Sequence, residues 1–159
     1  MTMEEELQKS EECYRTVLEA APDPVIVYDL DGNIIYLNPA FSRVFGWTLR
    51  ENKGQKINFI PTDSLSDARW ISMKISRGET ISGIETYRLA RDGRRIAVSI
   101  SGTEVLDSQG SSQGSIFTIQ DISTRKQTEE DIKFLAYHDT LTGLPNRTSF
   151  YMFLEDQLI

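Results

Sequence analysis

The chain has 159 residues, of which 39% are hydrophobic and 26% charged, ordinary globular values that exclude a collagen-like or disordered protein. Its formal charge of −7 comes from 24 acidic and 17 basic residues, and no Lys/Arg cluster forms the basic face that a nucleic-acid partner requires. At roughly 100–200 residues per domain, this length predicts one domain with appended segments.

Residues 1–20 are predicted to form a lead-in helix. Leu7, Tyr14, Val17 and Leu18 recur near the helical period without an internal Gly or Pro, and Pro22 then disfavours further helix. The Glu-rich start is unlike the basic start of a signal peptide, and no apolar run approaches the ~18 residues of a membrane span. We therefore expect a cytoplasmic chain, whose parent could carry a membrane anchor upstream.

A β-hairpin is predicted next. Residues 25–30 and 34–37 are β-branched or aromatic, and the Asp-Gly-Asn between them favours a tight turn. Asn38 followed by Pro39 predicts a helix start, and Gly46 a helix end.

Residues 47–61 are expected to form loop and short helical turns. A second helix is predicted to begin at Asp63 or Ser64 and to end at Gly78. One apolar face runs along it: Leu65, Ala68, Ile71 and Ile75.

Three further strands are predicted, over residues 82–90, 95–106 and 115–122, with a Ser/Gly loop at 108–114. In the middle strand, aliphatic residues alternate with small ones, which predicts one buried face: Ile96, Val98 and Ile100. Two strands, then helices, then three strands predict an α+β fold, in which helices cover one side of a five-stranded antiparallel sheet.

Beyond the last strand, residues 124–137 are predicted to form a charged helix with a thin apolar seam at Ile122, Ile132 and Ala136. Such a helix buries little surface alone. We therefore expect it to pack on the sheet or to pair with a second copy in a homodimer.

Four short motifs, in this order, resemble those of PAS sensor domains: Asn38 to Phe41, Phe45 to Trp47, Arg91 to Gly93, and Asp121, Ile122, Ser123 and Arg125. The resemblance implies a PAS fold over residues 21–123, flanked by the lead-in helix and by a signalling helix at 124–137. It also implies that Asp121, Ile122, Arg125 and Ile132 belong to the path that transmits a signal.

The last segment, residues 138–159, is similar to the start of GGDEF domains, the diguanylate cyclases. The matching residues are Asp139, Leu141, Thr142, Gly143, Leu144, Asn146 and Arg147. The resemblance implies a truncated GGDEF piece and a diguanylate cyclase as the parent protein. The GGDEF signature itself is absent, so we expect no cyclase activity and no catalytic residue in this chain.

Strand parity and helix positions predict an interior cavity. The expected lining is Ile26, Tyr28, Val98, Ile100, Phe117 and Ile119 from the sheet, and Phe45, Phe59 and Met73 from the helices. This lining suits a small or flat apolar molecule, with the Tyr28 hydroxyl as a polar handle. The alternative is a core filled by these side chains with no ligand.

Arg88 shares a strand face with Thr86. If that face points inward, Arg88 could bind a carboxylate, although a solvent-facing arginine is the commoner arrangement.

Familiar cofactors fit the sequence poorly. The only histidine, His138, lies outside the predicted domain, which disfavours haem held by His; Met73 or a tyrosine could substitute. The covalent flavin of light-sensing PAS domains needs a cysteine inside the fold, whereas Cys13 precedes the first strand and is expected to be a buried or partly buried thiol. Non-covalent flavin stays open, and no metal-ligand spacing occurs.

Together these observations favour the regulatory sensor module of a c-di-GMP signalling protein. A ligand-free PAS scaffold for dimerisation or protein interaction is the alternative. A module of another signalling protein, such as a histidine kinase, agrees less well, because His138 next to Asp139 resembles a phosphoacceptor site only superficially.

Overall fold

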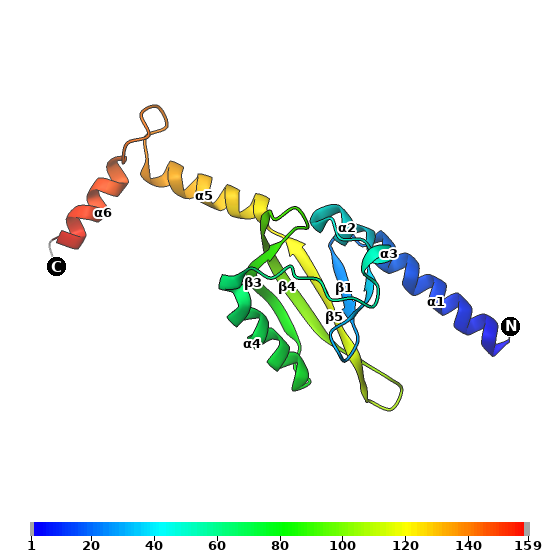
Figure 1. Ribbon diagram of the computed structural model, residues 1–159. Coiled ribbons are helices and arrows are strands. Elements are labelled where there is room, and N and C mark those ends of the chain that lie inside the picture. Colours follow the sequence, from blue (N-terminus) through cyan, green and yellow to red (C-terminus); the bar gives the residue numbers. More distant parts are fainter. Residues whose placement is uncertain (1, 158–159) are drawn as a thin grey trace. The chain divides into compact units, whose positions relative to one another are not determined.

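The computed structural model describes residues 2–157, and the chain divides into two compact units, 1–122 and 123–159. In chain order the elements (Figure 1) are α1 (Met3–Ala20), β1 (Val25–Tyr28), β2 (Ile34–Leu37), α2 (Pro39–Phe45), α3 (Leu49–Asn52), a 3₁₀ turn (Thr62–Ser64), α4 (Leu65–Ser76), β3 (Ile81–Leu89), β4 (Arg95–Leu106), β5 (Ser112–Asp121), α5 (Ser123–Tyr137) and α6 (Arg147–Gln157). The predicted α+β order is confirmed.

The first unit is built on one five-stranded antiparallel sheet in the order β2-β1-β5-β4-β3. The last strand lies in the middle, so that β5 pairs with β1 at Val25 and Thr118 and with β4 at Ile100 and Ile119. Helix α4 packs against β3 and β4 (Figure 1).

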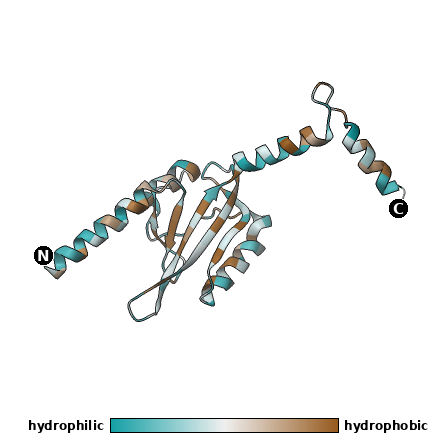
Figure 2. Cartoon of the chain, turned by 180° about the vertical axis from the view of Figure 1, so that it is seen from behind, coloured by the Kyte–Doolittle hydropathy of each residue, from teal (hydrophilic) through white to brown (hydrophobic). Residues whose placement is uncertain are grey.

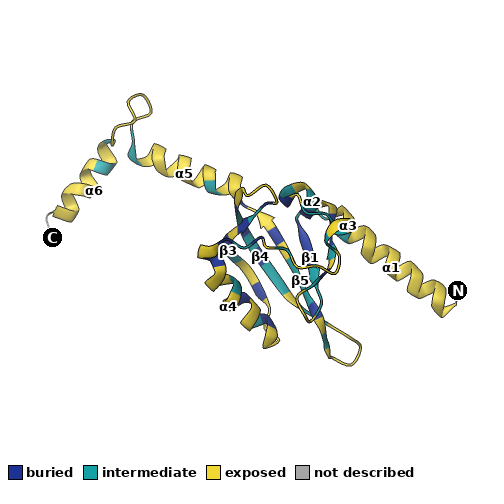
Figure 3. Ribbon diagram, viewed as in Figure 1, coloured by how far each residue is buried: buried dark blue, intermediate teal, exposed yellow. Residues whose placement is uncertain are grey.

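The core lies between the sheet and the helices that cover it. Ile96, Val98 and Ile100 are almost fully buried, which confirms the predicted alternation along β4. Figure 3 shows buried positions on the strands of the sheet. The same strands carry the apolar bands in Figure 2. An aromatic cluster joins α2 to the segment before α4, with ring centroids 4.9 Å apart for Phe41 and Phe45 and 5.8 Å apart for Phe41 and Phe59.

Asn38 connects several elements of this unit. It is fully buried and caps α2, with Pro39 in the first turn, as predicted. Its Oδ1 accepts hydrogen bonds from the backbone N–H of Phe41 (3.0 Å) and of Val25 (2.8 Å). Its Nδ2 donates to the carbonyls of Leu18 (3.1 Å) and Asp23 (3.0 Å), and so ties the end of α1 to the sheet.

The predicted loop over residues 108–114 was too long, because β5 begins at Ser112. Asp107 closes a short turn, its Oδ1 accepting from the backbone N–H of Gln109 and of Ser111, and the chain then pairs at once with β4. Of the Ser and Gly residues that suggested a loop, Ser112 and Gly114 lie in an irregular strand start, and the others lie in the turn. Gly114 has φ +147° there and passes close to the Tyr28 backbone.

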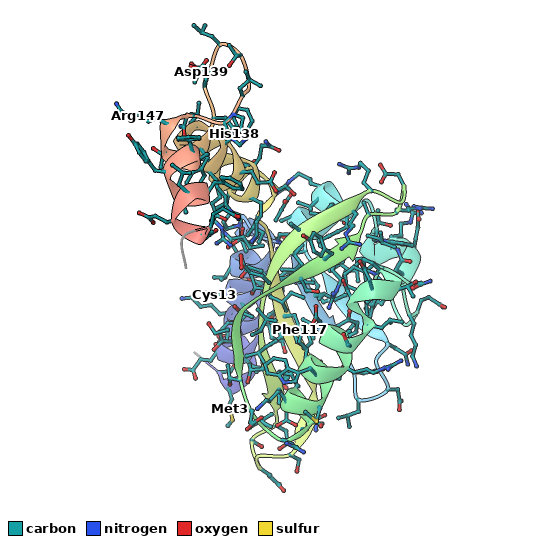
Figure 4. The ribbon with its side chains drawn as sticks, turned by 90° about the vertical axis from the view of Figure 1, so that its left-hand side faces the viewer. Met3, Cys13, Phe117, His138, Asp139 and Arg147 are labelled. Atoms are coloured by element: carbon teal, nitrogen blue, oxygen red, sulfur yellow. The ribbon has the colours of Figure 1, made fainter. Side chains whose placement is uncertain are left out.

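Helix α1 has no buried residue (Figure 3). Met3, Leu7, Tyr14 and Val17 are all more than half exposed. Cys13 is exposed on the same helix (Figure 4), so the expectation of a buried or partly buried thiol was wrong: nothing in the described chain covers its side of the helix. Within residues 2–157, no helix combines the length and the apolar character needed to cross a bilayer.

Candidate ligand cavity

A cavity of about 560 Å³ lies within the first unit, on the inner face of the sheet. Helix α4 and the segment 56–60 form its opposite wall. Its volume falls within the range of small-molecule sites, roughly 300–1,000 Å³. Most of the predicted lining residues surround it: Ile26, Tyr28, Phe59, Arg88, Ile100, Phe117 and Ile119.

The sheet wall is aromatic at one end. Tyr28 of β1 and Phe117 of β5 make an edge-to-face contact, with ring centroids 6.0 Å apart. Phe117 is labelled in Figure 4. The opposite wall contains Ile71 and Ile75 of α4, both buried, together with Ile57 and Ile60. The apolar face predicted for this helix could have identified Ile71 and Ile75 as lining residues. The irregular segment 56–60 offered no periodic signal.

Three predicted lining residues lie elsewhere. Met73 is 40% exposed, because it stands two positions from both Ile71 and Ile75 and so faces away from the wall that they form. Phe45 is fully buried in the aromatic cluster with Phe41 and Phe59. Val98 is also fully buried, on the inner face of β4 but beyond the cavity, since strand parity predicts the face and not the position along it.

Arg88 is the buried charge of the site, with 5% of its surface exposed. The solvent-facing arrangement is thereby excluded: Thr86 and Arg88 occupy the inner face of β3, while Tyr87 between them is exposed. The Arg88 Nη1 donates to the Tyr87 carbonyl (2.8 Å), and the guanidinium lies 5.6 Å from the Phe59 ring centroid. Among residues 2–157, no carboxylate forms a salt bridge with it.

Burial and neighbouring groups act in opposite directions on the pKa values of Arg88 and Tyr28 at this end of the cavity. Burial lowers the pKa of the Arg88 guanidinium, while the nearby Tyr28 and Asp67 act to raise it. Burial also raises the pKa of the Tyr28 phenol far above its ordinary value, against the opposing field of Arg88. At neutral pH the site therefore presents a neutral hydroxyl and a permanent positive charge.

The mouth of the cavity is polar, with Asp29, Gly32, Lys56 and Glu104 among its lining residues. The Asp29 carboxylate organises the turn between β1 and β2, since its Oδ1 accepts from the backbone N–H of Asn33 and of Asp31, both at 2.9 Å. The bond from Asn33 is the main cause that lowers the pKa of Asp29.

The predicted junction residues fall at the end of the first unit and in the second. Ile122 is buried, and its N–H donates to the Ala97 carbonyl (2.9 Å) at the end of the sheet, after Asp121. On α5, Arg125 forms an exposed pair with Glu129 at 3.6 Å, and Ile132 is 62% exposed.

A loop joins α5 to α6 and brings the remaining junction residues together. The Asp139 Oδ1 accepts from the backbone N–H of Leu141 (2.9 Å) and of Thr142 (3.1 Å), and the first of these bonds is the main cause that lowers the pKa of Asp139. Gly143 adopts φ +70°. Asn146 caps α6 by accepting from the Ser149 N–H, and its Nδ2 reaches the Ala136 carbonyl. Arg147, labelled in Figure 4, lies with its guanidinium 5.6 Å from the Tyr151 ring centroid.

The cavity does not fit covalent flavin, because its lining contains no cysteine and Cys13 lies on α1. His138 belongs to the second unit, where its ring stacks on Phe134 with centroids 4.2 Å apart. Among the residues that the structure describes, no group of three or more His, Cys, Asp or Glu side chains is placed to hold a metal ion.

Residues 12–122 match the family described as PAS fold. Among curated proteins, the chain is 28% identical over 151 residues to the probable diguanylate cyclase DgcE of Escherichia coli (strain K12), a match covering 93% of this chain and 14% of that protein. It is 31% identical to an uncharacterized signaling protein of Caulobacter vibrioides, over 87% of this chain and 16% of that protein. A cyclic di-GMP phosphodiesterase of Shewanella oneidensis, PdeB, is 24% identical over 91% of this chain and 16% of its own length.

Solved structures show the same fold. An RNA-binding light-oxygen-voltage receptor superposes with a TM-score of 0.68 at 21% identity, covering 79% of this chain and 36% of that one. The PAS domain of a protein from Colwellia psychrerythraea superposes with a TM-score of 0.64 at 20% identity, covering 73% and 99%. The chain thus spans about one seventh of the length of the curated relatives, and it shares the fold of these solved structures.

Proposed function

The chain belongs to the PAS family, and on that premise we propose that it is the sensory module of a c-di-GMP signalling protein. The observation that carries this proposal is the cavity of about 560 Å³ between the sheet and α4, lined mostly by apolar side chains. A ligand that binds two conformers of this unit unequally would shift their populations, and its differential affinity is the whole driving force.

The flanking helices supply the route to the output. On α1, Met3, Leu7, Ser10, Tyr14 and Val17 follow alternating intervals of four and three residues, the a/d spacing of a coiled coil. The apolar members of this seam are exposed in the single chain, as are Ile132 and Leu135 on α5. We therefore assign both helices to pairing with a second copy in parallel.

Such pairing would let a change in the PAS unit alter the register of α5. The signal would then enter the segment 138–159, which we assign to the start of a GGDEF domain. The parent protein would be a diguanylate cyclase, in keeping with the name of one curated relative, DgcE. The name of a second relative, PdeB, places it in cyclic di-GMP signalling as a phosphodiesterase.

Native mass spectrometry, with an absorbance spectrum of the same sample, tests this proposal. A dimer with added mass supports a ligand sensor, a bare dimer supports the ligand-free scaffold, and a monomer contradicts pairing by the helices. Leu7→Glu on the seam should dissociate the dimer, whereas Gln8→Glu, the adjacent position with the same added charge, should not. In the protein that contains this chain, an output unchanged by deletion of residues 21–123 would overturn the sensory role.

A further inference from the structure

The Arg88 guanidinium is a buried charge with which no carboxylate of residues 2–157 forms a salt bridge. It has five N–H donors, and its one hydrogen bond within residues 2–157 goes to the carbonyl of the neighbouring residue, Tyr87. A buried charge without a partner is unfavourable, so buried arginines are normally paired. A residue that served packing alone could be apolar at lower free-energy cost.

One acidic side chain, Asp67, acts on Arg88 electrostatically. The Asp67 Oδ2 accepts a hydrogen bond from the Thr86 hydroxyl at 2.9 Å, and Asp67 itself is exposed and lies outside the cavity lining. The other acidic groups along the cavity are at its mouth, where Asp29 is held by the backbone of its own turn. Among residues 2–157, no carboxylate forms a hydrogen bond or a salt bridge with Arg88, and Asp67 acts on it only through its electrostatic field.

The surroundings of Arg88 have the form of a binding site for one anionic group. The guanidinium lies against the Phe59 ring, and the Tyr28 hydroxyl lines the same cavity as a neutral donor. Beyond them the walls are apolar, with Ile100, Phe117 and Ile119 on the sheet. A flat guanidinium with free donors matches a carboxylate through two parallel hydrogen bonds.

We propose that this cavity binds a molecule with a single carboxylate on an apolar body, and that Arg88 receives the carboxylate. The inference rests on the proposed ligand-binding function and names the chemical class of the ligand. A phosphate monoester fits less well, because one buried cation would leave its second charge uncompensated among apolar walls.

The test compares acids with their neutral primary amides, which have nearly the same shape. The probes are 4-phenylbutyrate and decanoate, with 4-phenylbutanamide and decanamide as partners, titrated into the whole chain by calorimetry and by ¹H–¹⁵N NMR. At least one acid should bind about tenfold more tightly than its amide and should shift the Arg88 Nε–H resonance. Arg88→Met should abolish this preference without weakening the amide, and Arg88→Lys should keep part of it.

Two control variants test whether the preference for acids depends on Arg88 in particular. Lys56→Met removes the cation at the cavity mouth, and Arg94→Met removes an exposed arginine outside the lining; both should keep the preference for acids. If the Arg88→Met variant fails to fold, the preference of the unmodified chain and the Arg88 Nε–H shift decide the matter.

The measurements distinguish a failure of the acid proposal from a failure of the proposed sensory function. Acids and amides that bind equally well would overturn the acid proposal and leave the ligand sensor standing. Acids that keep their preference in Arg88→Met would overturn the role of Arg88. Absence of binding by all four probes would overturn the proposal for the ligand class, and only a preparation that also carries no ligand by native mass spectrometry would count against the sensor itself.

Discussion

At the scale of single residues, Asn38 is a buried side chain whose hydrogen bonds connect four segments of the first unit. Its four hydrogen bonds reach α1, the segment before β1, β1 itself and α2. Because the side chain is fully buried, water cannot replace these bonds when it is removed.

We expect Asn38→Ala to lower the free energy of unfolding by about 3 kcal/mol, combining a lost helix cap with buried groups left unsatisfied. Urea denaturation followed by circular dichroism measures the change. Asn58→Ala, at an exposed position, should change stability by less than about 0.5 kcal/mol. A loss of similar size in both variants would contradict the role assigned to Asn38.

Gly114 offers a second test at this scale, since two effects act there together. Its φ of +147° disfavours a side chain, and an added Cβ would overlap the carbonyl oxygen of Tyr28 and lie 3.0 Å from its carbonyl carbon. Gly110 also has a positive φ, +81°, but has no atom within 4 Å of an added Cβ.

Gly110→Ala should therefore cost about 1 kcal/mol, the backbone strain alone, whereas Gly114→Ala should cost about 3 kcal/mol or more. Thermal unfolding of the two variants separates strain from steric overlap. Equal costs would mean that β5 moves away from β1 without penalty, against the packing seen here.

At the scale of elements, the turn between β1 and β2 depends on an ionised carboxylate. Hydrogen bonds from the backbone N–H of Asn33 and of Asp31 lower the pKa of Asp29 below its ordinary value of 3.8. A group whose pKa is lower in the folded state stabilises that state above its unfolded pKa and loses this contribution as the pH falls through its folded pKa.

The melting temperature of the unmodified chain should thus exceed that of Asp29→Asn near about pH 6, and the difference should shrink toward about pH 2.5. Asp31→Asn changes a neighbouring carboxylate that accepts no hydrogen bond among those of the described chain. The difference in melting temperature between Asp31→Asn and the unmodified chain should stay nearly constant with pH. A difference for Asp29→Asn that does not depend on pH would contradict the assigned role of the ionised carboxylate.

The elements also show how far the sequence alone could lead. The cap at Asn38, the stop at Gly46 and the alternation along β4 follow from local rules, and they were predicted at these residues. Which face of β3 meets the core could not be predicted in this way, because alternation places Thr86 and Arg88 on the same face without deciding whether that face points inward. Nor could the start of β5, where serines and glycines suggest a loop.

The cavity was predicted best where a strand supplied its wall. Ile26, Ile100 and Ile119 lie where strand parity put them, facing the helices. Met73 and Val98 were misplaced, because rotation about a helix axis and position along a strand are decided by tertiary packing. The residues of segment 56–60 carry no periodicity from which their role could be inferred.

At the scale of the whole molecule, the division after residue 122 predicts an independent first unit. A chain ending at residue 122 keeps the bond from the Ile122 N–H to the Ala97 carbonyl and should melt within about 2 °C of the full chain. A chain ending at residue 118 lacks buried Ile119 and Ile122 and should not fold. Differential scanning calorimetry distinguishes these cases, and a large loss on removal of 123–159 alone would contradict independence.

The position of β5 between β1 and β4 also has a consequence for synthesis on the ribosome. The hairpins β1–β2 and β3–β4 each pair locally, but Val25 pairs with Thr118, so the first hairpin can join the sheet only after almost the whole unit has emerged. The entropy of closing so long a loop is recovered only when β5 arrives and joins the two hairpins. Completion of the sheet should therefore be a late and abrupt event of translation, and until then the inner apolar faces of both hairpins stay exposed to solvent.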